Sequence, residues 1–298
     1  MKRTIALLLL FASLLFLSSC KEKKRPSFDA NRAFEEIKAL VKISPRDAGT
    51  PGGKKAADHL CARLKSFGIK AQVESFTAQT PTGKKQMHNV IGYIKGTTKQ
   101  WIILGSHFDT MPGIPNFQGA NDSGSSTGIL LELARICAKY PPRVGLIFAF
   151  FDGEESTVEY RQNDGLYGSR LFAKQIKETG ISKHIYAMVL FDMVGDTSLH
   201  FTIPMNSSLP LIREFVNAAD ATGHHDRYSL MPTNVLDDHV PFMKIGIPSI
   251  DLIDFYFGSK PKSNDYWHTP ADNLEHISVE SLEITGTIAL QLVKQLAY

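Results

Sequence analysis

The stretch "RVGLIFAFFDGEE" at residues 143–155 joins a nearly continuous apolar run to a cluster of acids that follows it directly. An uninterrupted apolar run of this length is typical of a strand that is buried on both faces of a sheet. Glu154 and Glu155 are adjacent carboxylates at the end of that strand, where they repel each other and lose hydration. The stretch therefore predicts a covered sheet with a charged site at the end of one strand.

The same kind of strand recurs along the chain. Strand-like apolar runs occupy residues 69–76, 87–96, 100–109, 184–195 and 247–255, and helical spacing marks residues 28–42, 54–67, 121–140, 165–180, 209–223, 239–246 and 278–298. Helices that alternate with fully apolar strands indicate a sheet whose two faces are both covered. We predict an α/β fold: one domain, residues 28–298, with a mixed, mostly parallel central sheet and helices on both faces.

A leader precedes this domain. Lys2 and Arg3 are followed by an apolar run from about Ile5 to Leu17 and by the ending Leu-Ser-Ser-Cys. The run is short for a membrane span and typical of a secretory signal peptide. The ending resembles a bacterial lipobox, which predicts a signal peptide at residues 1–19, a lipid on Cys20 and a polar tether at residues 20–27. The alternative is a plain cleaved signal with an incidental cysteine.

Charge is divided unevenly between this leader and the domain. The first 25 residues carry six Lys or Arg and one Glu, whereas the rest of the chain carries 27 basic and 29 acidic residues. The positive excess belongs to the leader and tether, so we expect no nucleic-acid partner. Cys61 and Cys137 lie on helical patterns, which favours two buried thiols over a disulfide.

Ionisable side chains gather at the predicted strand ends and in two neighbouring loops. They are His107, Asp109, Asp122, Glu154, Glu155, Asp192 and His268. In a parallel sheet the carboxyl ends of the strands lie at one edge, which is where ligands bind. Carboxylates and imidazoles gathered there would repel and lose hydration, and a divalent cation removes that problem. Carboxylate and imidazole together are a fitting ligand set for zinc.

Five ordered motifs resemble those of the bacterial zinc aminopeptidase superfamily. They are "GSHFDT" (105–110), "GANDSGSSTGILLELAR" (119–135), "FFDGEE" (150–155), "FDMVG" (191–195) and "WHTPAD" (267–272). The resemblance covers roughly residues 30–298. Within the superfamily the chain is more similar to the animal-type glutaminyl cyclases, through "DGLYGSRLFAKQ" (164–175), "LDDHVPFMKIGIP" (236–248) and the Trp267–His268 pair.

This resemblance implies a glutaminyl-peptide cyclotransferase, which converts an N-terminal glutamine to pyroglutamate and releases ammonia. It implies a single catalytic zinc ion bound by Asp122, Glu155 and His268. Three protein ligands leave a fourth position open, as a catalytic zinc requires.

The resemblance also assigns the catalytic groups. Glu154 takes a proton from the substrate amine and passes it to the departing nitrogen, as general base and then acid. Asp192 and Asp237 form an acidic hydrogen-bonded network beside it. The side chains implied as substrate-binding walls are Trp267, Phe257 and Tyr160.

Two other functions fit the same residues. In a two-zinc aminopeptidase, His107 and Asp192 hold a second zinc, Asp122 bridges the two ions and Glu154 activates a water molecule. In a binding lipoprotein without activity, the ligand positions and Glu154 would have no reason to be retained. The division of roles between Glu154 and Glu155 rests on the family resemblance, because spacing alone does not assign it.

Two positions depart from the animal cyclases. Asp251 stands where those enzymes carry a histidine, and Tyr160 stands where they carry a tryptophan; both changes leave the zinc ligands intact. Leader and resemblance together predict an exported enzyme, lipid-anchored through Cys20 at the periplasmic face or surface of a bacterial cell. We expect it to act as a monomer on peptide or protein N-termini that bear glutamine.

Overall fold

The computed structural model describes residues 27–161 and 163–298. Six strands form one central sheet in the order β1-β2-β4-β3-β5-β8. Their bounds are β1 Lys70–Thr80, β2 Gly83–Ile94, β3 Trp101–His107, β4 Gly145–Phe151, β5 Ile185–Asp192 and β8 Ser249–Ile253. The pairs β4–β3, β3–β5 and β5–β8 are parallel, whereas β1–β2 and β2–β4 are antiparallel. The predicted mixed, mostly parallel sheet in a single domain is confirmed.

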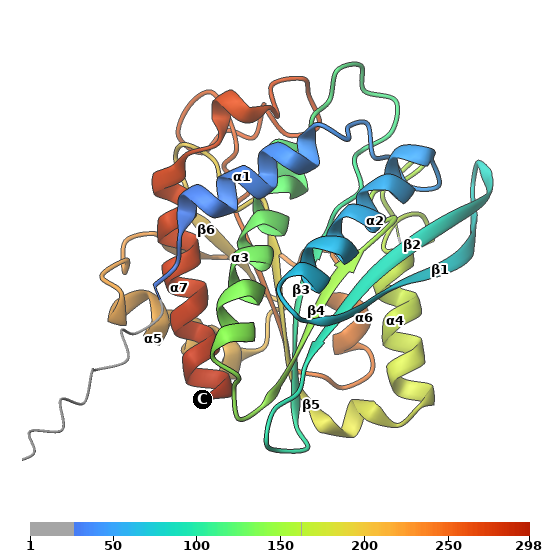
Figure 1. The fold of residues 1–298 in the computed structure, drawn as a ribbon. Coiled ribbons are helices and arrows are strands. Elements are labelled where there is room, and N and C mark those ends of the chain that lie inside the picture. The colour runs from blue at the N-terminus through green and yellow to red at the C-terminus, as the bar shows by residue number, and fades with distance from the viewer. Residues whose placement is uncertain (1–26, 162) are drawn as a thin grey trace, which may run out of the picture.

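Helices cover both faces of this sheet (Figure 1). One face is covered by α1 (Ala30–Val41), α2 (Pro51–Ser66), α3 (Ser126–Lys139), α5 (Leu209–Ala221) and α7 (Val279–Ala297), and the other by α4 (Tyr167–Glu178) and the short α6 (Val240–Met243). Strand β4 shows why both layers are needed. Leu146, Phe148 and Phe150 point into the first layer, and Ile147 and Phe151 into the second. Successive side chains of a strand alternate between faces, so an unbroken apolar run requires cover on both sides.

Some element boundaries differ from the sequence prediction. Helix α2 begins at Pro51, three residues before the predicted start, because Thr50 caps it and proline fits the first helical position. Helix α3 begins only at Ser126, after an irregular turn η1 at Ala120–Ser125 in which Asp122 is not helical. The remaining short helices are η2 (Ile181–His184) and η3 (Leu274–His276).

Two strands were not predicted from the sequence. Strands β6 (Phe201–Pro204) and β7 (Tyr228–Met231) form a separate two-stranded parallel sheet. Each strand has only four residues, which is too few to show a clear alternation of apolar and polar side chains. Thr202 at its edge donates to the carbonyl of Ile253 at the end of β8, so the small sheet continues from the carboxyl end of the main one.

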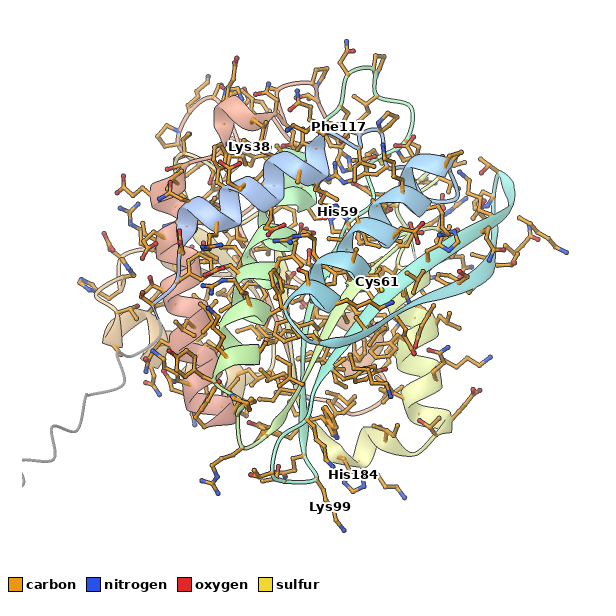
Figure 2. All side chains as sticks on the ribbon, viewed as in Figure 1. Lys38, His59, Cys61, Lys99, Phe117 and His184 are labelled. Atoms are coloured by element: carbon orange, nitrogen blue, oxygen red, sulfur yellow. The ribbon has the colours of Figure 1, made fainter. Side chains whose placement is uncertain are left out.

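Both cysteines of the domain are buried. Cys61 lies on α2 (Figure 2) and Cys137 on α3, and the structure leaves both as free thiols. The predictions about Cys20, the signal peptide and most of the tether fall outside the described residues. Within residues 27–161 and 163–298, no helix combines the length and hydropathy that a membrane span needs.

Candidate active site

The predicted site residues meet at one edge of the sheet. Because β3, β4 and β5 are parallel neighbours, the side chains at their carboxyl ends are carried to the same place. Phe117, whose ring lies edge-on to His268, is at this end of the molecule, whereas Lys99 and His184 lie at the opposite end (Figure 2). The topology therefore brings together segments more than 100 residues apart in the sequence.

The three predicted zinc ligands lie within reach of a single ion. His268 Nε2 lies 3.3 Å from Asp122 Oδ2 and 3.2 Å from Glu155 Oε1. All three offer ligand atoms within 4.8 Å of one another. Asp122 and Glu155 are buried, and His268 is partly exposed toward the cavity. The structure thus forms a candidate metal site with two carboxylates and one imidazole, a donor set that suits zinc.

The electrostatics of these three residues favour a cation. Burial raises the pKa of Glu155 to about 7, and the negative charge of Asp122 adds to this rise. Burial lowers the pKa of His268, but the carboxylates of Asp122 and Glu155 outweigh this and raise it to about 11. Without a metal, the imidazole must supply the positive charge itself. A divalent cation would neutralise both carboxylates and leave His268 neutral, the form that binds metals.

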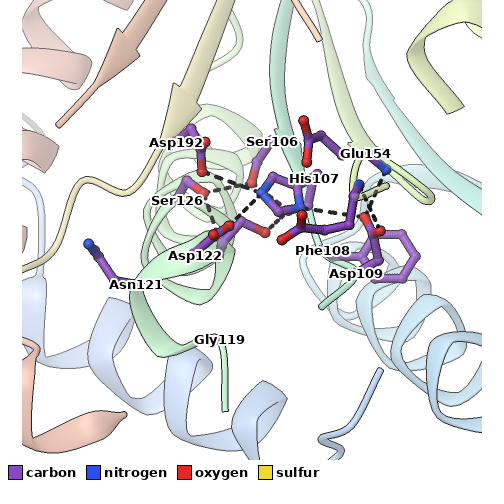
Figure 3. Close-up of polar contacts among 12 residues, drawn as sticks. Ser106, His107, Phe108, Asp109, Gly119, Asn121, Asp122, Ser126, Glu154 and Asp192 are labelled. Carbon is purple, nitrogen blue, oxygen red and sulfur yellow. Dashed lines mark hydrogen bonds and ion pairs between the residues drawn. The ribbon is translucent and has the colours of Figure 1, made fainter. Parts of the chain in front are cut away.

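A second group of possible ligands shares Asp122. His107 Nε2 lies 3.0 Å from Asp122 Oδ1 and 3.4 Å from Asp192 Oδ1, while His107 Nδ1 lies 3.4 Å from Asp109 Oδ1 (Figure 3). Burial disfavours a charged His107, yet the three carboxylates hold its pKa well above the usual value. Asp122 thus lies between the two groups, with one oxygen toward each imidazole. This geometry accommodates either one or two metal ions.

Two buried carboxylates hold the backbone that carries the ligands. Asp109 accepts hydrogen bonds from the backbone N–H groups of Glu154 (3.1 Å) and Glu155 (3.2 Å). Asp272 does the same for Asn121 (2.6 Å) and Asp122 (3.0 Å). Asp109 is one of the strand-end residues that the sequence places at this site. The role of Asp272 was missed, although the residue ends the motif "WHTPAD", because nothing in that motif indicates a bond to a loop 150 residues earlier.

Arg46 fixes the loop that leads to Asp122. Its buried guanidinium donates to the backbone carbonyls of Phe108 (2.6 Å), Gln118 (2.6 Å) and Gly119 (2.6 Å). These bonds join the end of β3 to the start of the turn η1.

Glu154 lies beside the candidate metal ligands, but its carboxylate points toward Tyr160. Its carboxylate accepts a hydrogen bond from the hydroxyl of Tyr160, whereas the neighbouring Glu155 faces His268. Burial raises the pKa of Glu154 well above the usual value, and the charge of Glu155 contributes to the rise. A carboxyl group with a raised pKa exchanges protons more readily near neutral pH, as a general base and acid must.

A cavity of about 270 Å³ opens in front of these residues. Its floor contains Asp122, Glu154, Glu155, Asp192, Asp237 and His268, and its apolar walls are Tyr160, Met193, Ile253, Phe255 and Trp267. The expectation for Phe257 is wrong: its side chain is 1% exposed and packs against Tyr266 with ring centroids 5.6 Å apart. Phe255, which the sequence does not indicate, lines the cavity instead.

Behind the cavity, Asp237, His239 and Asp251 form a buried polar cluster. The side-chain amide of Asn206 makes two bonds to the backbone of Val235, and its nitrogen then donates to His239 Nε2 at 2.9 Å. The imidazole therefore carries its hydrogen on Nδ1, which faces Asp251 Oδ2 at 3.7 Å. Burial lowers the pKa of His239 to about 4, in keeping with a neutral ring. At 3.7 Å this is a close approach and not a hydrogen bond, and Asp251 makes it from the position where the animal cyclases have a histidine.

Comparison with known proteins agrees with this site. The model of peptidase family M28 matches residues 89–293. A glutaminyl-peptide cyclotransferase of Drosophila melanogaster is 28% identical over 276 residues, which cover 83% of this chain and 75% of the relative. The crystal structure of an Acidobacteriales bacterium glutaminyl cyclase is 33% identical with a TM-score of 0.85, covering 92% of this chain and 97% of the other. A Zn-dependent exopeptidase from Parabacteroides distasonis is 28% identical with a TM-score of 0.79, covering 90% and 98%.

Proposed function

This chain belongs to the glutaminyl cyclases of peptidase family M28, and we propose that it is a zinc-dependent glutaminyl-peptide cyclotransferase with a single catalytic zinc ion. The observation that carries the proposal is the arrangement at the cavity floor. One glutamate faces the candidate metal ligands, and its neighbour lines the cavity where the substrate would react. The substrate class is a peptide or protein whose N-terminal residue is glutamine.

Asp122, Glu155 and His268 would hold the zinc ion. When bound there, zinc would act as a Lewis acid on the side-chain amide carbonyl of the substrate glutamine. The stacked rings of Trp267 and His268, whose centroids are 4.0 Å apart, restrict the orientation of the imidazole. The backbone bonds from Asp109 and Asp272 keep the two carboxylate ligands in place before substrate arrives.

The side chains of the protein would supply a proton relay for the reaction. The substrate α-amine attacks the side-chain amide carbon, a new N–C bond closes the five-membered ring, and the bond to the amide nitrogen breaks. Glu154 takes one proton from the amine and gives it to the departing nitrogen, which leaves as ammonia. No water molecule is consumed. Asp192 and Asp237 face the same cavity and would accept hydrogen bonds from the amine.

The cavity walls fit a short substrate side chain, and the rest of the substrate peptide continues outward. Trp267 is 40% exposed at the mouth, where its ring can lie over the glutamine side chain. Ile253 and Phe255 line the inner part of the cavity. The apolar walls beside the reacting amide limit the access of competing water, which would otherwise hydrolyse it.

A two-zinc aminopeptidase is the second candidate, and one observation favours it. His107, Asp122 and Asp192 also place ligand atoms within 4.8 Å of one another, as a second ion would require. In that enzyme Glu154 would activate a water molecule for peptide hydrolysis.

One comparison separates the two functions. Purified holoprotein is incubated with a Gln-initiated peptide and with a Leu-initiated peptide of the same remaining sequence, and both are followed by mass spectrometry. Loss of ammonia from the first peptide supports the cyclase, and release of free leucine from the second would contradict it. Two zinc ions per chain in metal analysis would contradict the single-zinc mechanism.

We also propose that the enzyme is exported and anchored to a bacterial membrane by a lipid on Cys20. The support is the lipobox-like ending of an apolar leader followed by a polar tether. Replacing Cys20 by serine should move the protein from the membrane fraction to the soluble fraction without changing its activity. Retention of Cys20→Ser in washed membranes would contradict the lipid anchor.

A further inference from the structure

Tyr160 spans the cavity from one loop to another. Its hydroxyl contacts Glu154 Oε1 on the loop after β4 and lies 2.9 Å from the backbone carbonyl of Leu236, on the loop before α6. Its ring lines the cavity and is 38% exposed at the residue level. The residue was predicted only as an apolar wall. Its polar contacts give it a second role.

The loop that carries Tyr160 and the segment that carries Leu236 are each held by hydrogen bonds that do not involve Glu154. The carboxylate of Asp164 accepts the backbone N–H groups of Thr157 (2.9 Å), Val158 (2.8 Å) and Glu159 (3.1 Å), which shapes the loop that presents Tyr160. On the other side, Asn206 fixes Val235, the neighbour of Leu236. Hydrogen bonds within two separate segments therefore set the position of the hydroxyl.

The hydroxyl of Tyr160 can form a hydrogen bond with Glu154 whether or not Glu154 carries a proton. A phenol carries one hydrogen and can also accept hydrogen bonds, whereas a carboxylate and a carbonyl are acceptors only. When Glu154 is ionised, the hydroxyl of Tyr160 donates to it. When Glu154 carries a proton, the carboxylic acid can donate to the hydroxyl oxygen, and the hydroxyl hydrogen can turn to the carbonyl of Leu236. Glu154 keeps a hydrogen-bond partner in either case.

We propose that Tyr160 is a positioning residue for proton transfer by Glu154. Its hydroxyl, placed between Glu154 Oε1 and the Leu236 carbonyl, fixes the Glu154 carboxylate and offers it a partner that can donate or accept a hydrogen bond. This inference rests on the proposed function, in which Glu154 must act as base and then as acid. The tryptophan that the animal cyclases carry here has only an N–H donor, which cannot accept a bond from a protonated Glu154. The device therefore belongs to chains with tyrosine at this position.

Three substitutions at Tyr160 separate the hydroxyl from the ring. Tyr160→Phe keeps the wall and removes the hydroxyl, so kcat on a Gln-initiated peptide should fall about 10- to 100-fold, the effect of losing a hydrogen bond to a charged group. KM should stay within about twofold because the wall is intact. Tyr160→Trp should lose a similar factor in kcat. Tyr160→Ala should also raise KM, because it removes the wall as well.

Tyr167→Phe is the matched control. The Tyr167 hydroxyl donates to Asp164 Oδ1 at 3.0 Å in the same loop and does not contact Glu154. Its loss should leave kcat unchanged. Equal losses in Tyr167→Phe and Tyr160→Phe would overturn the proposal in favour of general loop order. A raised KM with unchanged kcat in Tyr160→Phe, or loss of its bound zinc, would also overturn it.

Failure of the proposed function and failure of the Tyr160 proposal would give different results. If the unaltered enzyme forms no pyroglutamate, the proposed function has failed. If the unaltered enzyme forms pyroglutamate and Tyr160→Phe has the same kcat, the role of the hydroxyl is refuted and the proposed function stands.

Discussion

Glu154 and Glu155 are neighbours with different partners. Glu155 contacts His268 and belongs to the candidate metal group, whereas Glu154 contacts Tyr160 and faces the cavity. Adjacent residues in an extended segment point in different directions, which allows this division. A cation bound beside Glu155 and a proton on Glu154 would each relieve the repulsion between the two carboxylates.

The two residues should therefore fail in different ways. Glu154→Gln should keep zinc and lower kcat by about 10²- to 10⁴-fold, the usual contribution of a general acid–base group. Glu155→Gln, its matched partner, should lose zinc. Zinc content and kcat measured on both variants test the division. If Glu154→Gln loses zinc, the roles of the two glutamates are exchanged.

At the scale of the secondary-structure elements, the site forms at the carboxyl ends of the strands, and Asp109 connects the segments that follow two of them. It follows β3 and accepts the N–H groups of Glu154 and Glu155 after β4. This contact links parallel neighbours directly at their carboxyl ends. The geometry of the metal ligands therefore depends on a residue that does not itself bind the metal.

Asp109→Asn tests this dependence. The amide would present N–H groups to one of the two backbone donors, leaving that donor without an acceptor. We expect zinc affinity to fall about 10- to 100-fold, as is common when a residue that orients a ligand is changed. Competition with a chelator gives the measurement. Asp58→Asn, at an exposed position on α2, is the control, and equal affinities for the two variants would contradict the role of Asp109.

At the scale of the whole molecule, a buried acid pair outside the cavity should make stability depend on pH. Asp254 accepts the N–H groups of His200 (2.6 Å) and Tyr256 (2.7 Å), and Asp196 accepts that of Ser198 (3.1 Å). Burial and the charge of Asp196 raise the pKa of Asp254 to about 8, and burial also raises the pKa of Asp196. The folded state therefore holds a proton that the unfolded chain releases near pH 4.

The sign of the effect follows from these pKa values. Because the folded pKa is raised, the stabilisation from this proton is complete below about pH 4 and is lost as pH rises toward 8. In Asp196→Asn, the amide oxygen can still accept the backbone N–H of Ser198, and the amide N–H can donate to the carboxylate of Asp254. Relative to the unaltered protein, its free energy of unfolding should rise by on the order of 1–2 kcal/mol between pH 5 and pH 8.

Urea denaturation of the zinc-bound proteins at both pH values measures that difference. Asp220→Asn, on the exposed face of α5, serves as the control. A difference between Asp196→Asn and the unaltered protein that does not change with pH would refute the shared proton.

The sequence by itself determined the architecture and most of the candidate site. The unbroken apolar run before Glu154 requires cover on both faces, and this physical demand is local enough to be recognised in one stretch of chain. The ordered motifs also named Asp122, Glu155 and His268, which the structure brings together. The fold prediction is confirmed because its signal lies within short segments, and the role of the three side chains as zinc ligands stays a prediction.

Only the tertiary structure decided which residues support and line the site. Asp272, Asn206 and Phe255 act through contacts between segments far apart in the chain, and such contacts leave no periodic signal. The sequence interpretation of Phe257 as a wall residue is wrong because this residue lies in an irregular segment after β8, where no periodic pattern indicates which side chains face the cavity. The hydroxyl of Tyr160 found its partners only when two loops met across the cavity. The sequence specifies strands and their chemistry, and folding brings their ends into contact.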